Sequence, residues 1–273
     1  MTPAPPLRLG HINYSNCLPI HAGVIERPPA GVEIVAGVPS ELNRLLERGE
    51  IDVAPCSSVE YARHADRYRL LPGLAIGSRG AVRSIVFLSD REPGRLHGRK
   101  VALPNASATS VVLLRVLFHA RYGAEPEYFW FDQRRDDPFE LGADAALFIG
   151  DTALRPGLHP ERRVRLDLGT EWADQTGLPL AFALWQTRAP VVPGVAGLHR
   201  ALLASRERGL RRLDALARKS AASFGVAPSE LAAYWGGLSY GLDAEMREGL
   251  HAFYQLAAEI GEVPEEPALR WAV

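Results

Sequence analysis

Strand-like and helix-like patterns alternate through the first third of this chain of 273 residues. Short apolar runs, which are typical of buried strands, alternate with segments whose apolar residues recur at helical spacing. The strand-like runs are Leu7–Gly10, Val32–Val38, Ile51–Ala54, Leu70–Ile76 and Arg83–Leu88. The helix-like segments are Pro19–Glu26, the leucine-rich segment after Ser40, and Val59–Asp66. Because neighbouring parallel strands need a long crossover between them, this order predicts βαβ units and a largely parallel sheet.

A second module of the same kind occupies the middle of the chain. Its strand-like runs are Lys100–Leu103, Tyr128–Phe131, Asp144–Ile149 and Val164–Leu168, and its main predicted helix is Ser107–Tyr122. From Val195 onward the pattern is helical. The predicted helices there are Val195–Phe224 (interrupted at Gly209), Ala227–Tyr234 and Ala244–Ile260, followed by a tail over residues 264–273.

The runs Arg83–Leu88 and Leu180–Trp185 flank the middle module, as the two crossovers of an inserted lobe would. We therefore predict an α/β protein of two lobes, with a mixed, mostly parallel sheet in each lobe and a cleft between them. Residues 1–88 and 186–273, including the C-terminal helices, are expected to form lobe one, and residues 89–185 to form lobe two. Two lobes joined by two crossovers can close on a ligand.

Composition excludes several classes of partner. The hydrophobic content of 47% is ordinary for a globular protein. The net charge is −1, so the chain as a whole has no electrostatic attraction to nucleic acid or to an acidic membrane surface. The N-terminus lacks the apolar core of a signal peptide, and no apolar run is long enough to span a membrane, which predicts a cytoplasmic protein. The cysteines, Cys17 and Cys56, are expected to be small packed residues rather than a disulfide.

Two polar turns follow predicted strands and are the first candidates for a ligand site. Gly10–Ile20 (GHINYSNCLPI) carries two Asn, a Tyr and a Ser just before Pro19, a residue favoured in the first turn of a helix. Asn105–Ser110 (NASATS) is a second turn of this kind. Ligands of open α/β sheets bind beyond the carboxyl ends of strands, so the two turns predict one ligand held from two sides.

The second turn carries the more specific signal. A helix beginning near Ser107, Thr109 and Ser110 offers unpaired N–H groups and a partial positive charge beside three hydroxyls, which suits a carboxylate or a phosphate. One hydroxyl suffices for ordinary N-capping, so the surplus favours a ligand.

Two further polar residues are candidates for substrate binding. Asp151, after a buried strand, can orient a hydroxyl, act as an acid or base, or cap the next helix. Ser84 lies in a crossover strand and faces either the core or the cleft. Arginine is so common in this chain that the sequence leaves open whether Arg79 or Arg83 contacts a ligand.

Several common site motifs are missing from the sequence. The eight histidines are scattered, without the spacing of a metal-binding helix, and no P-loop, GxGxxG or GxSxG occurs. We therefore expect no metal and no cofactor. The candidate residues bind carboxylates and hydroxyls but are poor bases. An enzyme built on them needs an easily activated substrate, or one that brings its own base.

An ordered series of segments now points to one family. The segments are Gly10–Asn16 with Pro19, Leu45–Gly49, Ile51–Ala54, Ser57–Tyr61, Val82–Val86, Ser107–Ser110, Ile149–Leu154, Asp167–Gly169 with Trp172, and Gly177–Leu180 with Ala183–Trp185. In this series the chain resembles the chorismate dehydratases of the futalosine route to menaquinone. The resemblance implies a periplasmic-binding-protein-like fold of type II and a carbon–oxygen lyase that needs no metal or redox cofactor.

The resemblance also implies a reaction and roles for individual residues. Chorismate, a dicarboxylate, would lose water to give 3-[(1-carboxyvinyl)oxy]benzoate. The second Asn of the opening motif, the residue most tied to catalysis in the family, is Asn16 here. Ser84, Thr109 and Ser110 match positions expected to hold carboxylates. The base stays open between the substrate's own enolpyruvyl carboxylate, His11 and Asp151.

Two other functions compete with this interpretation. The first is a 1,4-dihydroxy-6-naphthoate synthase-like enzyme of the same pathway, a family that looks less similar in the opening motif. The second is a solute-binding protein that senses or delivers an aromatic acid, which the missing signal peptide and lipidation cysteine disfavour; its cytoplasmic form is an aromatic-acid-binding protein. A homodimer is also possible on this sequence.

Overall fold

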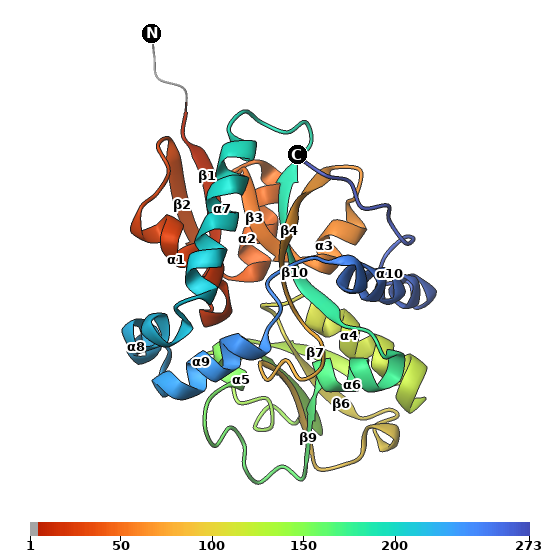
Figure 1. Ribbon diagram of the computed structural model, residues 1–273. Helices are drawn as coiled ribbons and strands as arrows, with labels where there is room; N and C mark the ends of the chain where they lie inside the picture. The colour runs from red at the N-terminus through yellow and green to blue at the C-terminus, as the bar shows by residue number, and fades with distance from the viewer. Residues whose placement is uncertain (1–4) are drawn as a thin grey trace.

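The computed structural model describes residues 5–273 and contains two five-stranded sheets (Figure 1). The first sheet has the order β2-β1-β3-β10-β4. Its strands are β1 (Leu7–Ile12), β2 (Val32–Gly37), β3 (Val53–Ser57), β4 (Tyr68–Ser78) and β10 (Leu180–Arg188). The second sheet has the order β7-β6-β8-β5-β9. Its strands are β5 (Ile85–Ser89), β6 (Lys100–Pro104), β7 (Glu127–Phe131), β8 (Ala145–Ile149) and β9 (Val164–Asp167).

Both sheets are mixed, which confirms the predicted fold class. β1 is parallel to β2 and β3, and β6 is parallel to β7 and β8. The antiparallel pairings all involve β10 in the first sheet and β5 in the second. Half of the pairings in each sheet are thus antiparallel, more than expected, because the strands next to the two crossovers run against their neighbours.

The sheet pairings move the expected lobe boundaries by one strand each. The expected boundaries, after residues 88 and 185, put β5 in the first lobe and β10 in the second. Instead β5 pairs with β8 and β9, while β10 pairs with β3 and β4. The chain therefore crosses between the lobes before β5 and again before β10. Both strands are largely buried apolar runs, and such runs carry no mark of the sheet to which they belong.

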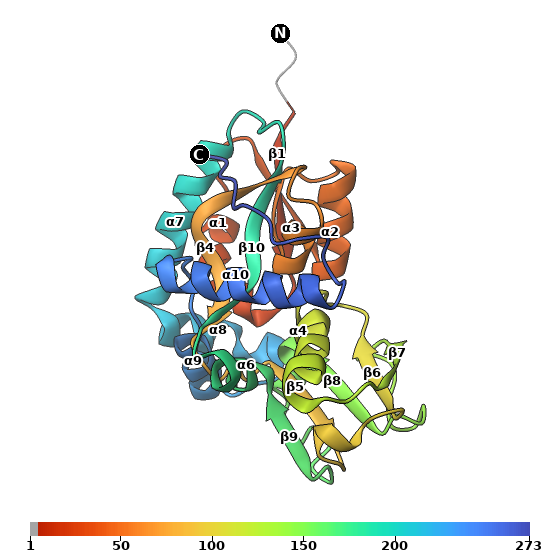
Figure 2. The same cartoon turned by 90° about the vertical axis from the view of Figure 1, so that its right-hand side faces the viewer.

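Helices cover the faces of both sheets. The first lobe carries α1 (Leu18–Glu26), α2 (Pro39–Arg48), α3 (Ser58–Arg63), α7 (Val195–Leu210) and α10 (Ala244–Glu259). α8 (Leu213–Phe224) and α9 (Pro228–Gly237) pack on each other, and α9 lies beside Arg155 and Arg165 of the second lobe. The second carries α4 (Thr109–Leu117), α5 (Gly150–Ala153) and α6 (Leu168–Thr176). The helix predicted over Ser107–Tyr122 begins two residues later, and its last turn, Phe118–Tyr122, is π-helical. Figure 2 shows α10 lying across β10, on which it packs.

The C-terminal tail covers the outer edge of β4. The Leu70 N–H donates to the carbonyl of Arg270, and the Ala272 N–H donates to the carbonyl of Leu70. The Tyr61 hydroxyl secures the same segment, since it donates to the Ala268 carbonyl at 2.8 Å and accepts from the Arg270 N–H at 2.8 Å. An exposed edge strand can pair with other chains, and this arrangement protects it.

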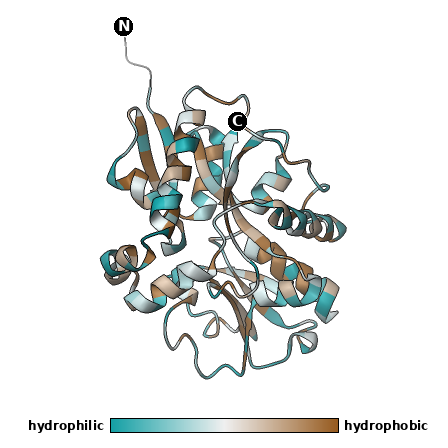
Figure 3. Cartoon of the chain, in the orientation of Figure 1, coloured by the Kyte–Doolittle hydropathy of each residue, from teal (hydrophilic) through white to brown (hydrophobic). Residues whose placement is uncertain are grey.

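The core follows the strands through both lobes. Every residue of β3, β5 and β8 is buried, and Figure 3 shows these central strands as the most hydrophobic part of the fold. Cys17 and Cys56 are both buried and free, as expected. Among residues 5–273, no helix is long and apolar enough to cross a membrane.

Two histidines form a hydrogen-bonded pair between β1 and α1. Trp185 Nε1–H donates to His21 Nε2 at 3.0 Å, so the proton of a neutral His21 ring sits on Nδ1 and points to His11 Nδ1, 3.1 Å away. Burial lowers the pKa of His11 to about 4. Burial, together with the charge of His11, lowers the pKa of His21 well below its ordinary value.

We expect this pair to make the protein less stable as the pH falls from 6.5 to 4. The unfolded chain protonates both rings near pH 6.5, whereas folded His11 does so only near pH 4. The unfolded state therefore binds more protons in this window, and the free energy of unfolding rises with pH. Urea unfolding at a series of pH values measures the effect. In His11→Gln, the free energy of unfolding should change less with pH than in the parent protein. His119→Gln, at an exposed position, should show the same pH dependence as the parent. Equal pH dependence in the parent and both variants would contradict the account.

Candidate active site

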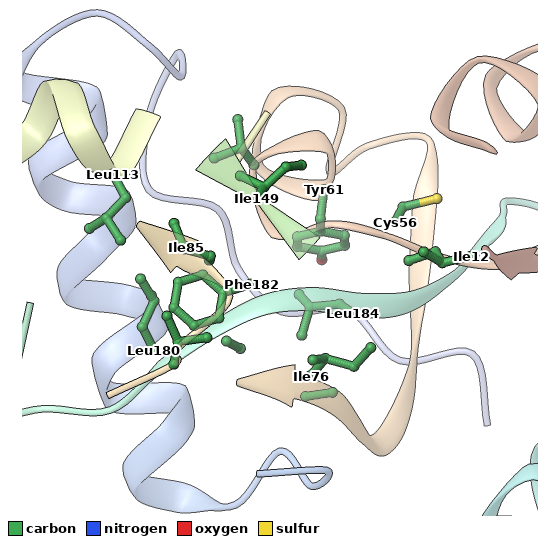
Figure 4. Packing of buried hydrophobic residues seen from close by; sticks show 14 of the residues in the cluster. Ile12, Cys56, Tyr61, Ile76, Ile85, Leu113, Ile149, Leu180, Phe182 and Leu184 are labelled. Atoms are coloured by element: carbon green, nitrogen blue, oxygen red, sulfur yellow. The ribbon is translucent and has the colours of Figure 1, made fainter. Parts of the chain in front are cut away.

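A pocket opens between the two lobes where both turns predicted from the sequence meet. It is small, with about 60 Å³ of space open to the centre of a water molecule. Its apolar lining residues are Ile12, Pro39, Ile76, Val82, Ile85, Ile149, Phe182, Ala183 and Leu238. Its polar side chains are Tyr14, Asn16, Ser57, Ser84, Ser107 and Ser110, and the Gly150 backbone completes it. Figure 4 shows Ile85 and Phe182 side by side next to β10.

Asn16 is the most informative polar group in this pocket. It lies in the short 3₁₀ helix Ser15–Cys17, between β1 and α1, so its side chain sits beyond the carboxyl end of a central strand. Its Oδ1 is buried and has no hydrogen-bond partner among residues 5–273. Such a buried acceptor costs free energy unless something else satisfies it, so a ligand donor is its natural partner.

Tyr14 contributes a second unpartnered group. Its hydroxyl is buried without a partner in the described part of the chain. Burial raises the pKa of Tyr14 to about 12, so the phenol stays protonated at neutral pH and can donate a hydrogen bond. Its ring also packs against Gly150, where an added Cβ would lie 3.0 Å from two ring atoms. Gly150 has a φ of +60°, so glycine both suits the turn and leaves room for Tyr14.

Three of the predicted serines line the pocket. The Ser107 Oγ accepts from the Ser110 N–H at 3.3 Å and lies 3.0 Å from the Ser110 Oγ, so this pair organises the N-terminus of α4. Ser84 precedes β5 and accepts a 2.8 Å hydrogen bond from the buried Tyr234 hydroxyl. Hydroxyls beside a helix N-terminus form a site for a carboxylate.

The structure places Thr109 and Asp151 differently from expectation, because neither lines the pocket. The Thr109 Oγ1 lies 3.2 Å from the Ser58 Oγ and accepts from the Val59 N–H at 3.3 Å. The Asp151 carboxylate accepts from both the backbone N–H and the hydroxyl of Ser15. Each side chain belongs to the second lobe and binds the start of a helix in the first. Both therefore hold the lobes together, a role that single-strand patterns do not reveal.

The structure also places Arg79 and Arg83, the two arginines whose contact with a ligand the sequence left open. Arg79 pairs with Asp243 and Glu245. The Arg83 side chain lines a separate hollow, beside Arg155 and Glu230. Neither arginine lines the pocket that holds Asn16.

His11 lies outside the pocket as well. One ring nitrogen of His11, one of His21 and the Cys17 Sγ all lie within 4.8 Å of one another, a grouping that the sequence spacing did not predict. The His21 Nδ1 carries the proton that it donates to His11, so this nitrogen serves a hydrogen bond rather than a metal.

Sequence reasoning missed several contributors to the site, among them Tyr234 and Phe182. Tyr234 comes from α9, in a stretch that reads only as an amphipathic helix. Phe182 comes from β10, an apolar strand that reads only as core. The presence of Tyr14 in the opening polar turn was the one available signal for an aromatic group.

Comparisons with known proteins point to one family. Residues 7–259 match the family model described as menaquinone biosynthesis. The chain is 36% identical over 266 residues to a chorismate dehydratase of Thermus thermophilus, covering 91% of this chain and 94% of that protein. It is 30% identical over 179 residues to a chorismate dehydratase of Campylobacter jejuni, covering 64% of each chain.

Solved structures share the fold. A protein from Archaeoglobus fulgidus has a TM-score of 0.75 at 20% identity, covering 94% of this chain and 98% of its own. The alkanesulfonate-binding protein of Xanthomonas axonopodis has a TM-score of 0.72 at 16% identity, covering 98% of both chains. The fold is therefore that of periplasmic binding proteins, as predicted. The family model and the relative in Thermus thermophilus show that the chain belongs to the menaquinone biosynthesis family, in the group of the chorismate dehydratases.

Proposed function

We propose that this protein is a chorismate dehydratase, which removes water from chorismate to give 3-[(1-carboxyvinyl)oxy]benzoate. One observation carries the proposal: Asn16 lines a pocket together with several hydroxyls, and its amide oxygen is buried without a hydrogen-bond partner among residues 5–273. The close relative in Thermus thermophilus bears the same activity in its name. The pocket suits a small dicarboxylate that also carries a hydroxyl group.

The two carboxylates of the substrate have two sets of donors. Ser107 and Ser110 stand at the N-terminus of α4, where backbone N–H groups and the helix dipole favour an anion. Ser84 and Tyr14 supply hydroxyl donors from elsewhere in the pocket lining. In this arrangement the Asn16 Oδ1 accepts from the ring hydroxyl of chorismate and orients the C–O bond that breaks.

The chemistry follows from charge that develops on the substrate. The proton leaves the ring carbon that bears the enolpyruvyl ether, and the electrons of that C–H bond spread through the ring diene onto the ring carboxylate. Donors that bind this carboxylate more tightly in the transition state lower the barrier. The hydroxyl group then leaves the adjacent carbon, taking up the released proton as water, and the ring becomes aromatic.

We assign the base to the substrate's own enolpyruvyl carboxylate. The side chains that line the pocket, within residues 5–273, include no His, Asp, Glu or Lys. The Asp151 carboxylate is occupied by Ser15, and His11 is bonded to His21 outside the pocket. The raised pKa of Tyr14 makes its phenolate scarce at neutral pH. Asn16→Asp with full turnover would contradict the role of the amide.

Asp151 and Thr109 are proposed to bind substrate indirectly, by stabilising the closed arrangement of the lobes. We expect Asp151→Ala to raise KM for chorismate by about tenfold, while kcat changes less. Without this contact, part of the binding free energy of the substrate must be used to bring the lobes together. Steady-state kinetics measures this split. Asp174→Ala, an exposed carboxylate on α6, is the control. An unchanged KM in Asp151→Ala would refute the closing role.

Incubation of the purified protein with chorismate, followed by chromatography with mass detection, tests the proposed function. The expected product is 3-[(1-carboxyvinyl)oxy]benzoate. Chorismate that binds in a thermal-shift assay but stays intact would instead identify an aromatic-acid-binding protein. Absence of both binding and turnover, with conversion of a cyclised futalosine derivative, would identify a dihydroxynaphthoate synthase. The expected homodimer and cytoplasmic location stay predictions, to be checked by light scattering and cell fractionation.

A further inference from the structure

A second hollow lies beside the pocket, separated from it by the hydrogen-bonded pair Ser84 and Tyr234. Tyr234, in α9, lines this hollow, and its hydroxyl donates at 2.8 Å to the Oγ of Ser84, which lines the pocket. The hollow has about 350 Å³ of space open to the centre of a water molecule, against about 60 Å³ in the pocket. It therefore has room for a small ligand of its own.

Positive charge dominates the lining of this hollow. Its charged residues are three arginines and one glutamate, namely Arg83, Arg155, Arg165 and Glu230. Among residues 5–273, no carboxylate oxygen lies within 4.0 Å of any of these three guanidinium groups. Arginine is common in this chain, but the nearby Arg162 pairs with Asp90 at 2.5 Å. Three guanidinium groups without a carboxylate around one hollow attract an anion.

The backbone around Arg83 is built to hold this residue in place. Arg83 lies in the crossover before β5 and has a φ of +63°, a left-handed conformation that is costly for a residue with a side chain. Such a conformation persists where its surroundings hold it. Here the Asp167 carboxylate does so, because it accepts from the backbone N–H groups of both Val82 and Arg83.

The other two arginines reach the hollow from neighbouring parts of the second lobe. Arg165 lies in β9, and Arg155 follows α5. The Arg165 guanidinium donates to the carbonyls of Ala153 and Leu158, each at 3.4 Å. These two carbonyls flank Arg155 in the chain, so the loop that carries Arg155 is bound to the side chain of Arg165. All three arginines thus line one hollow from three separate segments.

We propose that this hollow binds a small anion through a carboxylate or phosphate group, at a site separate from the pocket. Guanidinium groups present paired N–H donors that match both kinds of group, and their charge strengthens each hydrogen bond. Leu154, Leu158 and Val226 line the same hollow and suit the carbon part of such a ligand. Glu230 opposes further negative charge, which favours a ligand with one anionic group over one with several.

Calorimetric titration of the purified protein with butyrate and with glycerol 3-phosphate tests for the site. Low ionic strength is used because salt screens the attraction between charges. We expect at least one of the two anions to bind, and the one that binds more tightly identifies the preferred group. Their neutral counterparts, butyramide and glycerol, should not bind. Absence of binding by both anions would overturn the proposal.

Substitutions of the charged lining residues test where the anion binds. Arg155→Gln and Arg83→Gln should each weaken binding by about tenfold, since each removes a charged donor. Glu230→Gln should instead strengthen it, because the opposing charge is gone. Arg163→Gln is the matched control: Arg163 is exposed in the same segment but does not line the hollow. Equal weakening in Arg155→Gln and Arg163→Gln would show attraction to net charge alone and overturn the proposal.

Ser110→Ala distinguishes the hollow from the pocket, where hydroxyls also suit an anion. Anion binding should be unchanged in this variant. Binding that is lost in Ser110→Ala and kept in Arg155→Gln would place the anion in the pocket and overturn the proposal. Urea unfolding of each variant separates lost binding from lost folding, and the exposed Arg155 is expected to be replaced without loss of stability. The experiment uses no chorismate, so its outcome is independent of the proposed function.

Discussion

Replacing Asn16 by alanine is expected to lower kcat for chorismate by about 100- to 1000-fold, the loss typical of a removed transition-state hydrogen bond. Asn16 lines the pocket, and its Oδ1 is a buried acceptor without a partner among residues 5–273. Removing it takes away the group that orients the departing hydroxyl. The fold should not suffer, because an unsatisfied buried oxygen contributes no stability. Steady-state turnover and urea unfolding together measure both effects.

Asn13→Ala is the control for this prediction. Asn13 lies in the same turn but is exposed and does not line the pocket. It should keep activity within about twofold. Asn16→Ala with near-parental kcat, or with a collapse in stability that accounts for its lost activity, would contradict the assigned role.

Gly249→Ala is expected to destabilise the protein by about 2–3 kcal/mol, the usual cost of overpacking a core. Gly249 lies in α10, and an added Cβ would stand 1.8 Å from the Pro179 carbonyl oxygen. That carbonyl accepts a 3.2 Å hydrogen bond from Trp172 Nε1, so it cannot shift without breaking a buried contact. The helix would have to move away from the segment that leads into β10.

Gly236→Ala provides the comparison for Gly249→Ala. A Cβ at Gly236, in α9, meets nothing within 4 Å among the described residues. Because alanine favours helix more than glycine does, this variant should be unchanged or more stable by up to about 1 kcal/mol. Urea denaturation of both variants gives the difference. Equal midpoints would show that α10 does not pack as closely as described.

The alternation of strands and helices could be predicted because periodicity is a local property of sequence. The βαβ order, the inserted lobe and the helical C-terminal third were all readable in this way. The partners of β5 and β10 were not, since both are buried apolar strands and pairing depends on distant segments. The meeting of His11 with His21 was hidden for another reason: it depends on how α1 is placed against β1, which the helical and strand patterns do not specify.

The site residues, too, fall into those that local sequence predicts and those whose placement depends on distant segments. Asn16, Ser84, Ser107 and Ser110 were found from polar turns and from resemblance, and all four line the pocket. Thr109 and Asp151 follow the same turns, yet their side chains cross to the other lobe. Whether such a side chain points into the pocket or to the other lobe depends on its hydrogen-bond partners there. These partners lie at the first residues of helices that are distant in the sequence. Tyr234 lies in a helix whose pattern carries no signal of a site.

The most direct test of the central claim is to follow chorismate and its product over time with purified protein at neutral pH. The account predicts that chorismate disappears as 3-[(1-carboxyvinyl)oxy]benzoate accumulates, one molecule for one, and that Asn16→Ala shows almost no conversion while Asn13→Ala matches the parent. Chorismate that remains intact with well-folded parent protein, or a product that Asn16→Ala forms equally fast, would contradict it.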